Sequence, residues 1–149
     1  MKTIAIIGIG KWGKKLVAEF SQYFKIKYCY SKGDKSNIRW IKKNYPLINY
    51  ASNLDTILDD LEVDGVVIAT PIHTHYSLVK KALSHKKHVF VEKPIDTNVK
   101  NAKNLLEIAK KNNLTLFVGS IFLYHSILKK LKDISRNEQI KFLYFDWKK

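Results

Sequence analysis

The chain has 149 residues, of which 46% are hydrophobic and 12% aromatic, and its 27 basic and 13 acidic residues give a net charge of +14. This length corresponds to one domain with a sizeable core, and the composition excludes global disorder. No apolar run approaches the roughly 18 residues of a membrane span, and the stretch Ile4–Ile9 is too short and too early for the core of a signal peptide. The single cysteine, Cys29, excludes a disulfide framework and a cysteine-based zinc site, so we expect a cytoplasmic protein without a membrane partner.

The positive charge raises the question of a nucleic-acid surface. Nearly all of it is lysine, with 25 Lys and only Arg39 and Arg136, and much of it occurs as Lys-Lys pairs spread along the chain. Base readout favours arginine forks and stacked aromatic rings, and neither pattern is present. The sequence therefore indicates a solvated lysine surface rather than a nucleic-acid interface.

Short apolar runs alternate with segments of helical periodicity from the first residues onward. The runs predict strands at residues 2–7, 26–30, 49–51, 65–70, 88–91, 114–119 and 140–147. The periodic segments predict helices at 13–24, from a cap at Ser36 to Pro46, at 53–61, at 75–84, from a cap at Asp96 or Thr97 to Asn112, and at 126–135. Repeated strand–helix units of this length predict an α/β fold, a Rossmann-type doubly wound parallel sheet with helices on both faces. Such a sheet binds ligands at the carboxyl ends of its strands.

The segment Gly8-Ile9-Gly10-Lys11-Trp12-Gly13 follows the first strand and opens the first helix. In that context Gly-x-Gly-x-x-Gly is typical of a dinucleotide site. Gly8 permits the tight turn, Gly10 lets the backbone approach a pyrophosphate, and Gly13 lets the helix lie near the strand. The free N–H groups of the helix N-terminus then face the diphosphate.

The end of the second strand bears on which dinucleotide is bound. NAD sites carry an acidic residue there for the ribose hydroxyls, whereas this chain has Ser31 followed by Lys32. A serine and a lysine suit the 2′-phosphate of NADP, which a carboxylate would repel. The sequence therefore favours NADP over NAD as the NAD(P) cofactor. If the loop is longer than expected, Asp34 takes the ribose instead.

Further motifs end the later strands. The fourth strand ends in Thr70-Pro71-x-x-x-His75, the fifth in Glu92-Lys93-Pro94, and the sixth is followed by a Phe-Leu-Tyr-His segment at residues 122–125. Together with the glycine loop, these motifs resemble the amino-terminal half of the glucose–fructose oxidoreductase, inositol dehydrogenase and rhizopine catabolism (Gfo/Idh/MocA) family. The resemblance covers essentially the whole chain.

The resemblance implies hydride exchange between NAD(P) and a sugar, nucleotide-sugar or polyol carbon. It implies that Lys93 is the catalytic residue and that the Lys93–Pro94 bond is cis. It implies cofactor contacts from Gly8, Ile9, Gly10, Lys11, Trp12, Gly13, Ser31, Lys32, Thr70, Pro71, His75 and Glu92. A lysine suits the role because a hydroxyl proton must leave when hydride leaves the carbon. For His75, a packed residue at a helix N-terminus is an equal alternative, and no pair of histidines has convincing metal spacing, so we expect no metal site.

Family members are more than twice as long, and their second half supplies the substrate pocket. We therefore expect residues 1–122 to form the NAD(P)-binding domain, and residues 123–149 to form a helix and the first strand of a C-terminal domain that this sequence lacks. That strand would leave an open edge, through which we expect oligomerisation. The sequence leaves open an isolated domain, a truncated reading frame, or a short protein that pairs with another chain. It also leaves open two functions. One is an oxidoreductase that needs a second domain or chain for its sugar-type substrate. The other is a stand-alone dinucleotide-binding module or partner subunit.

Overall fold

The computed structural model describes residues 1–32, 35–137, 141, 142, 144 and 146. The chain forms two compact units, Met1–Gly119 and Ser120–Lys149, and each is described by itself. The domain boundary expected after residue 122 remains a prediction.

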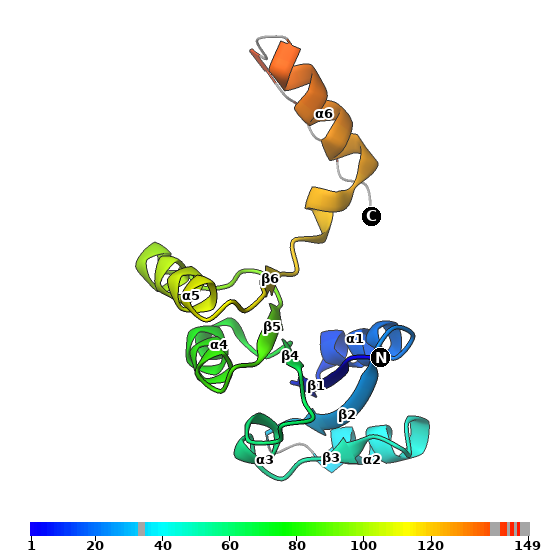
Figure 1. Cartoon of the computed structure of the whole chain (residues 1–149). Coiled ribbons are helices and arrows are strands. Elements are labelled where there is room, and N and C mark those ends of the chain that lie inside the picture. The colour runs from blue at the N-terminus through cyan, green and yellow to red at the C-terminus, as the bar shows by residue number, and fades with distance from the viewer. Residues whose placement is uncertain (33–34, 138–140, 143, 145, 147–149) are drawn as a thin grey trace. The chain divides into compact units, whose positions relative to one another are not determined.

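In the first unit strands alternate with helices (Figure 1). The strands are β1 (Thr3–Ile7), β2 (Lys25–Tyr30), β3 (Asn49–Tyr50), β4 (Gly65–Ile68), β5 (His88–Val91) and β6 (Leu116–Val118). The helices are α1 (Lys11–Phe20), α2 (Lys35–Asn44), α3 (Asp55–Leu58), the 3-10 turn η1 (Ile72–Thr74), α4 (His75–Ser84) and α5 (Val99–Lys111). Every pair of neighbouring strands is parallel, in the order β3-β2-β1-β4-β5-β6. The predicted doubly wound parallel sheet is confirmed.

The strand order reverses at the centre of the sheet. From β1 the chain winds outward through β2 and β3, and it then returns to the other side of β1 to form β4, β5 and β6. The connections that leave β1 and β4 therefore diverge, and they open a crevice at the carboxyl ends of these strands. This is the edge at which we expect a ligand from the sequence.

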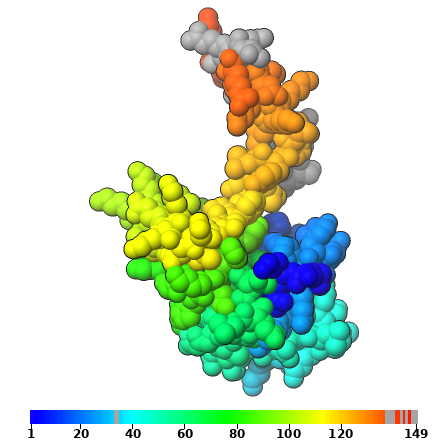
Figure 2. Space-filling view, in the orientation of Figure 1, coloured from blue at the N-terminus to red at the C-terminus, as the bar shows by residue number. Residues whose placement is uncertain are grey.

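The core lies on both faces of the sheet because successive side chains of a strand point in opposite directions. Along β1, Ile4 and Ile6 join the cluster under α1 and α2, whereas Ala5 and Ile7 join the cluster under α3, α4 and α5. Figure 1 shows α1 on one side of the sheet and α4 and α5 on the other, and Figure 2 shows the yellow-green α5 beside the green α4. Burial of each isoleucine contributes about 2–3 kcal/mol, so an uninterrupted apolar strand is stable only with helices on both sides.

Several helix ends differ from the sequence expectation. α2 begins at Lys35, so Ser36 lies inside the helix and is not its cap. Asn98, rather than Asp96 or Thr97, caps α5 by accepting a 2.8 Å hydrogen bond from the backbone N–H of Lys100. Asp96 instead accepts from the N–H of Asn98 and shapes the preceding turn. Three good capping residues stand in a row here, and the position at which the chain turns into the helix decides among them.

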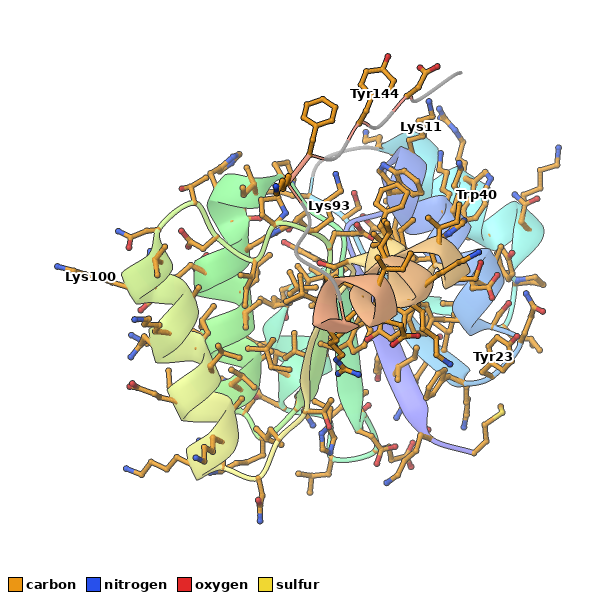
Figure 3. The ribbon with its side chains drawn as sticks, turned by 90° about the horizontal axis from the view of Figure 1, so that it is seen from above. Lys11, Tyr23, Trp40, Lys93, Lys100 and Tyr144 are labelled. Carbon is orange, nitrogen blue, oxygen red and sulfur yellow. The ribbon has the colours of Figure 1, made fainter. Side chains whose placement is uncertain are left out.

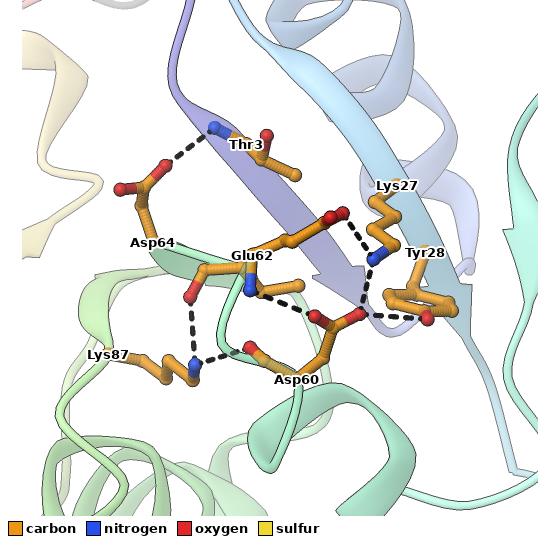
Figure 4. A network of polar contacts seen from close by, with 8 residues as sticks. Thr3, Lys27, Tyr28, Asp60, Glu62, Asp64 and Lys87 are labelled. Carbon is orange, nitrogen blue, oxygen red and sulfur yellow. Dashed lines mark hydrogen bonds and ion pairs between the residues drawn. The ribbon is translucent and has the colours of Figure 1, made fainter.

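α3 is shorter than the predicted helix at 53–61, because its C-terminal continuation is held in a polar network at the amino-terminal edge of the sheet (Figure 4). Asp60 accepts hydrogen bonds from Lys27 at 2.6 Å, from the Tyr28 hydroxyl at 2.9 Å and from the Glu62 N–H at 2.9 Å. The bond to Lys27 is the main reason that the pKa of Asp60 falls to about 2. The network therefore fixes this loop to β2 and ends the helix.

The same edge carries two further polar contacts (Figure 4). Asp64 accepts a 2.8 Å hydrogen bond from the Thr3 N–H at the start of β1. The ammonium group of Lys87, a buried residue, donates to the carbonyls of Asp60 and Val63 at 2.7 and 2.8 Å. Burial lowers the pKa of Lys87. These contacts lie at the end of the sheet opposite the crevice and serve the fold.

The second unit contains the 3-10 turn η2 (Ile121–Tyr124) and the helix α6 (Ser126–Asn137). The predicted strand at 140–147 lies partly outside the described residues. Its described members, Lys141, Phe142, Tyr144 and Asp146, do not lie in a strand.

Candidate functional site

A cleft of about 640 Å³ lies at the carboxyl ends of β1, β2 and β4. It is lined by Ile7, Gly8, Ile9, Gly10, Tyr30, Ser31, Lys32, Asn37, Ala69, Thr70, Pro71, His73, Thr74, Ser77 and Leu78. These residues come from the connections that diverge at the reversal of strand order. The cleft therefore lies where doubly wound sheets bind ligands, and its volume suits a cofactor-sized molecule.

The glycine loop forms one wall of the cleft, and Gly8 and Gly13 are each required by a contact. Gly8 has φ +96°, and a Cβ there would lie 2.5 Å from the carbonyl oxygen of Ala69. A Cβ on Gly13 would lie 1.8 Å from the carbonyl oxygen of Gly8, so only glycine lets α1 approach the turn so closely. The backbone N–H of Gly8 donates to the carbonyl of Tyr30 at 2.7 Å, which ties the loop to the end of β2.

Gly10 differs from the other two glycines because space is open around it. A Cβ built there meets nothing within 4 Å, and Gly10 is exposed as the N-cap of α1. The N–H groups of the first turn have no acceptor within the helix. The first turn of α1 contains no acidic residue, and Lys11 lies in it. This helix N-terminus therefore offers unpaired donors, partial positive charge and room for an anionic group.

The end of β2 forms the opposite wall. Asn37 of α2 is buried, lines the cleft and donates from its side-chain amide to the Ser31 hydroxyl at 3.3 Å. The carbonyl of Ser31 accepts a hydrogen bond from the Tyr50 hydroxyl, and Lys32 is exposed at the rim. No Asp or Glu is among the described residues that line the cleft. Asp34, the alternative ribose ligand, lies outside the described residues.

The ends of β4 and β5 are linked beside the cleft. Thr70 and Thr74 share a hydrogen bond between their hydroxyls at 2.7 Å, and Thr74 also donates to the carbonyl of Pro71 at 2.7 Å. His75 is 1% exposed, and its ring nitrogens lie 2.8 Å from the Thr70 carbonyl oxygen and 2.9 Å from that of Pro94. The Lys93–Pro94 peptide bond is cis, as the resemblance to the family implies.

The structure brings together seven of the residues predicted to contact the cofactor, since Gly8, Ile9, Gly10, Ser31, Lys32, Thr70 and Pro71 all line the cleft. Lys11, Trp12 and Gly13 lie in the first turn of α1, which Gly10 begins. Figure 3 shows Lys93 in the middle of the view, between the green helix and the blue α1, and Lys93 is exposed. Glu92 is half-buried beside Gly119.

Sequence reasoning missed several lining residues, namely Tyr30, Asn37, His73, Thr74, Ser77 and Leu78. Asn37 gave a weak signal, since it is a polar residue near the start of a helix that follows the predicted ribose-binding turn. Tyr30 ends β2. His73, Thr74, Ser77 and Leu78 reach the cleft only when η1 and the first turn of α4 fold beside β4.

Neither a metal centre nor a membrane segment is found in the described part of the chain. Its His, Cys, Asp and Glu residues form no group of three or more that could hold a metal ion. Among the same residues, no helix has both the length and the apolar character needed to cross a bilayer. Cys29 is a free, fully buried thiol, and burial raises its pKa to about 12.

The parallel sheet, the glycine turn and the cleft at the reversal of strand order define a dinucleotide-binding domain of the Rossmann type. Residues 2–120 match the model of the GFO_IDH_MocA family, described as an oxidoreductase family with an NAD-binding Rossmann fold. The chain therefore belongs to the Gfo/Idh/MocA oxidoreductase family, as the sequence motifs predict.

Individual relatives agree with this assignment. The chain is 31% identical over 137 residues to the uncharacterized oxidoreductase YrbE of Bacillus subtilis, covering 91% of this chain and 40% of that protein. It is 30% identical over 139 residues to myo-inositol 2-dehydrogenase of Thermotoga maritima, covering 92% and 41%. The crystal structure of scyllo-inositol dehydrogenase from Lactobacillus casei with bound NAD(H) and scyllo-inositol superposes with a TM-score of 0.81 at 23% identity, covering 95% and 42%. The chain thus spans about two fifths of the length of these proteins.

Proposed function

We propose that this chain is the cofactor-binding part of an NAD(P)-dependent dehydrogenase that exchanges hydride with a sugar, nucleotide-sugar or polyol carbon. The observation that carries the proposal is the glycine loop at the reversal of strand order. There Gly8 and Gly13 are held by close contacts, whereas Gly10 faces open space at a helix N-terminus. This loop fits a diphosphate, because its unpaired N–H groups and nearby lysines are donors and cations.

The cofactor contacts follow the two halves of the cleft. The diphosphate would be held by Gly8, Ile9, Gly10, Lys11, Trp12 and Gly13, the adenosine ribose by Ser31 and Lys32, and the nicotinamide side by Thr70, Pro71 and Glu92. His75 is buried and does not line the cleft, so it would support the nicotinamide side from behind Thr70. When bound, the nicotinamide would supply or accept the hydride. Lys93 would hold the substrate oxygen: in the direction of reduction its ammonium form would give a proton to the carbonyl oxygen, and in the direction of oxidation its neutral amine would take the hydroxyl proton.

We propose NADP as the preferred dinucleotide. The support is the Ser31–Asn37 pair with Lys32 at the rim, and the lack of a carboxylate among the described residues that line the cleft. A 2′-phosphate carries two negative charges at most, so a neutral hydrogen-bonding pair and an adjacent cation favour it over the free ribose hydroxyl.

The remaining partners are also proposals. The name of the Thermotoga maritima relative, myo-inositol 2-dehydrogenase, supports a polyol or sugar substrate. Since the chain spans only part of its relatives, we propose that turnover requires a second domain or chain, with assembly through the C-terminal segment. The lone buried thiol fits a reducing compartment such as the cytoplasm.

Fluorescence titration of the 149-residue chain with NADPH and NADH tests the proposal. Trp12 is 56% exposed in the first turn of α1, so it should report binding together with the emission of the reduced nicotinamide. We expect both dinucleotides to bind and NADPH to bind more tightly. Tighter NADH would overturn the cofactor preference alone, whereas binding of neither would overturn the function. Turnover of inositols or sugars by the chain alone would contradict the need for a second domain.

A further inference from the structure

The side chain of His75 connects two loops that lie far apart in the sequence. Its Nε2 is 2.8 Å from the carbonyl oxygen of Thr70, which follows β4. Its Nδ1 is 2.9 Å from the carbonyl oxygen of Pro94, which follows β5. β4 and β5 are neighbours, with Ile68 opposite Val91, so both loops leave the same edge of the sheet side by side.

The ring of His75 is held firmly in this place. It is the first residue of α4 and is 1% exposed, so neither solvent nor a ligand reaches it readily. Either neutral tautomer donates to one of the two carbonyls, and the doubly protonated ring donates to both. A carbonyl that loses its donor away from water is left unsatisfied, which is unfavourable. Displacement of a loop whose carbonyl accepts from the ring would therefore break a part-buried hydrogen bond.

The two loops carry different parts of the proposed site. Thr70 and Pro71 line the cleft, whereas Lys93 precedes Pro94 in the other loop. The η1 turn is fixed separately by the Thr74 hydroxyl, which bonds Thr70 and Pro71. The hydrogen bonds of His75 thus join the Thr70 loop to the Pro94 loop.

We propose that His75 is a positioning residue that fixes the Lys93–Pro94 turn against Thr70 and Pro71, and so holds Lys93 at the nicotinamide end of the cleft. The proposal rests on the proposed function, because the role of Lys93 comes from there. His75 acts through the two backbone carbonyls and not through the cofactor.

Three substitutions separate the two hydrogen bonds. The amide nitrogen of Asn is as many bonds from Cα as Nδ1 of His, so His75→Asn keeps a donor for Pro94 and loses the one for Thr70. The amide nitrogen of Gln corresponds to Nε2, so His75→Gln keeps a donor for the Thr70 carbonyl and loses the one for the Pro94 carbonyl. His75→Phe keeps a buried ring and removes both bonds. Val79→Ala is the matched control, because Val79 is fully buried in the same helix and is not among the residues that line the cleft.

The measurements are the affinities for NADPH and for 2′-phospho-ADP-ribose, which lacks the nicotinamide, together with the emission of bound NADPH. We expect His75→Phe to weaken NADPH binding about tenfold and to lower its emission, while 2′-phospho-ADP-ribose binds within about twofold of wild type. His75→Asn should restore more of the NADPH signal than His75→Gln, since it keeps the bond to the Lys93–Pro94 turn. Val79→Ala should lower the melting temperature without changing the ratio of the two affinities.

Two results would overturn the proposal. One is an unchanged NADPH affinity and emission in folded His75→Phe. The other is an equal loss for NADPH and 2′-phospho-ADP-ribose, which would make His75 merely structural. If His75→Phe does not fold, the comparison of His75→Asn with His75→Gln decides alone, and equal behaviour of these two refutes a role at the Lys93–Pro94 turn. Failure of the wild type to bind any dinucleotide would instead refute the proposed function.

Discussion

Gly10 and Gly13 stand three residues apart in one loop, yet the structure gives them opposite tolerances for a methyl group. Alanine at position 10 places Cβ in open space, whereas alanine at position 13 places it 1.8 Å from the carbonyl oxygen of Gly8. We expect Gly10→Ala to reduce dinucleotide affinity with little loss of stability. We expect Gly13→Ala to reduce stability.

The magnitudes follow from the local geometry. At Gly10, alanine is a poorer N-cap than glycine by up to about 1 kcal/mol, but it also removes about 0.4–1 kcal/mol of unfolded-state entropy. These two effects nearly cancel, so the melting temperature should change by less than about 2 °C. A phosphate oxygen bonded to the loop needs an approach of about 2.9 Å, and a methyl group at that position obstructs it. We expect the Kd for NADPH to rise about 10- to 100-fold, or about 1.4–2.7 kcal/mol.

At Gly13 the clash involves two segments of backbone, neither of which can rotate away as a side chain can. A Cβ–O distance of 1.8 Å must grow by well over 1 Å, which requires α1 to move away from the turn. Val17 of α1 is fully buried against the sheet, so this movement also opens the core. Overpacking of this kind costs about 1–3 kcal/mol or more.

The assay is a thermal melt of each variant followed by NADPH titration well below its melting temperature. The reasoning is refuted if Gly10→Ala binds NADPH as tightly as the wild type does. It is also refuted if Gly10→Ala and Gly13→Ala lose similar stability, because the open and closed surroundings of the two glycines would then make no difference.

Three further outcomes are expected. Ser31→Asp should weaken NADPH at least tenfold and leave NADH within a few-fold, because a carboxylate repels the 2′-phosphate; an unchanged ratio of the two Kd values would remove Ser31 from the cofactor site. The pKa of Asp60 is about 2 in the folded protein and 3.8 ordinarily, so its contribution to the free energy of unfolding is complete above about pH 4 and is lost as the pH falls toward 2. Urea unfolding should show that Asp60→Asn loses less stability than the wild type over this pH range, and an equal pH dependence of stability in the two proteins would contradict the network. Cys29 should react with a disulfide reagent at mildly alkaline pH only as fast as the protein opens, since its thiol is fully buried with a pKa of about 12; immediate labelling would show that β2 is not packed as described.

The sequence was sufficient for features that depend on neighbours along the chain. Apolar runs such as Gly65–Ile68 have no alternation, which indicates burial on both faces and hence a parallel sheet. The triplet Gly8, Gly10 and Gly13 could be interpreted as a dinucleotide site because that interpretation depends only on the strand before it and the helix after it. The end of α5 near Asn112 was also readable, but its start was not, because Asp96, Thr97 and Asn98 are all good caps.

Long-range contacts explain what the sequence left open. The predicted helix at 53–61 has a good apolar pattern, but Asp60 is held by Lys27 and Tyr28 from β2, and the helix ends before it. Asn37 became part of the cleft only because α2 returns over the end of β2.

The sequence by itself determined the class of fold, the glycine loop and the family, because each of these depends on residues that are close together in the chain. Only the tertiary structure decided that Gly10 faces open space while Gly13 is in contact with the turn, and that His75 is bonded to carbonyls 5 and 19 residues away in sequence. The physical reason is that a parallel sheet brings together the ends of strands that are separated by whole helices. The distances across its carboxyl edge are therefore set by packing and not by spacing in the sequence.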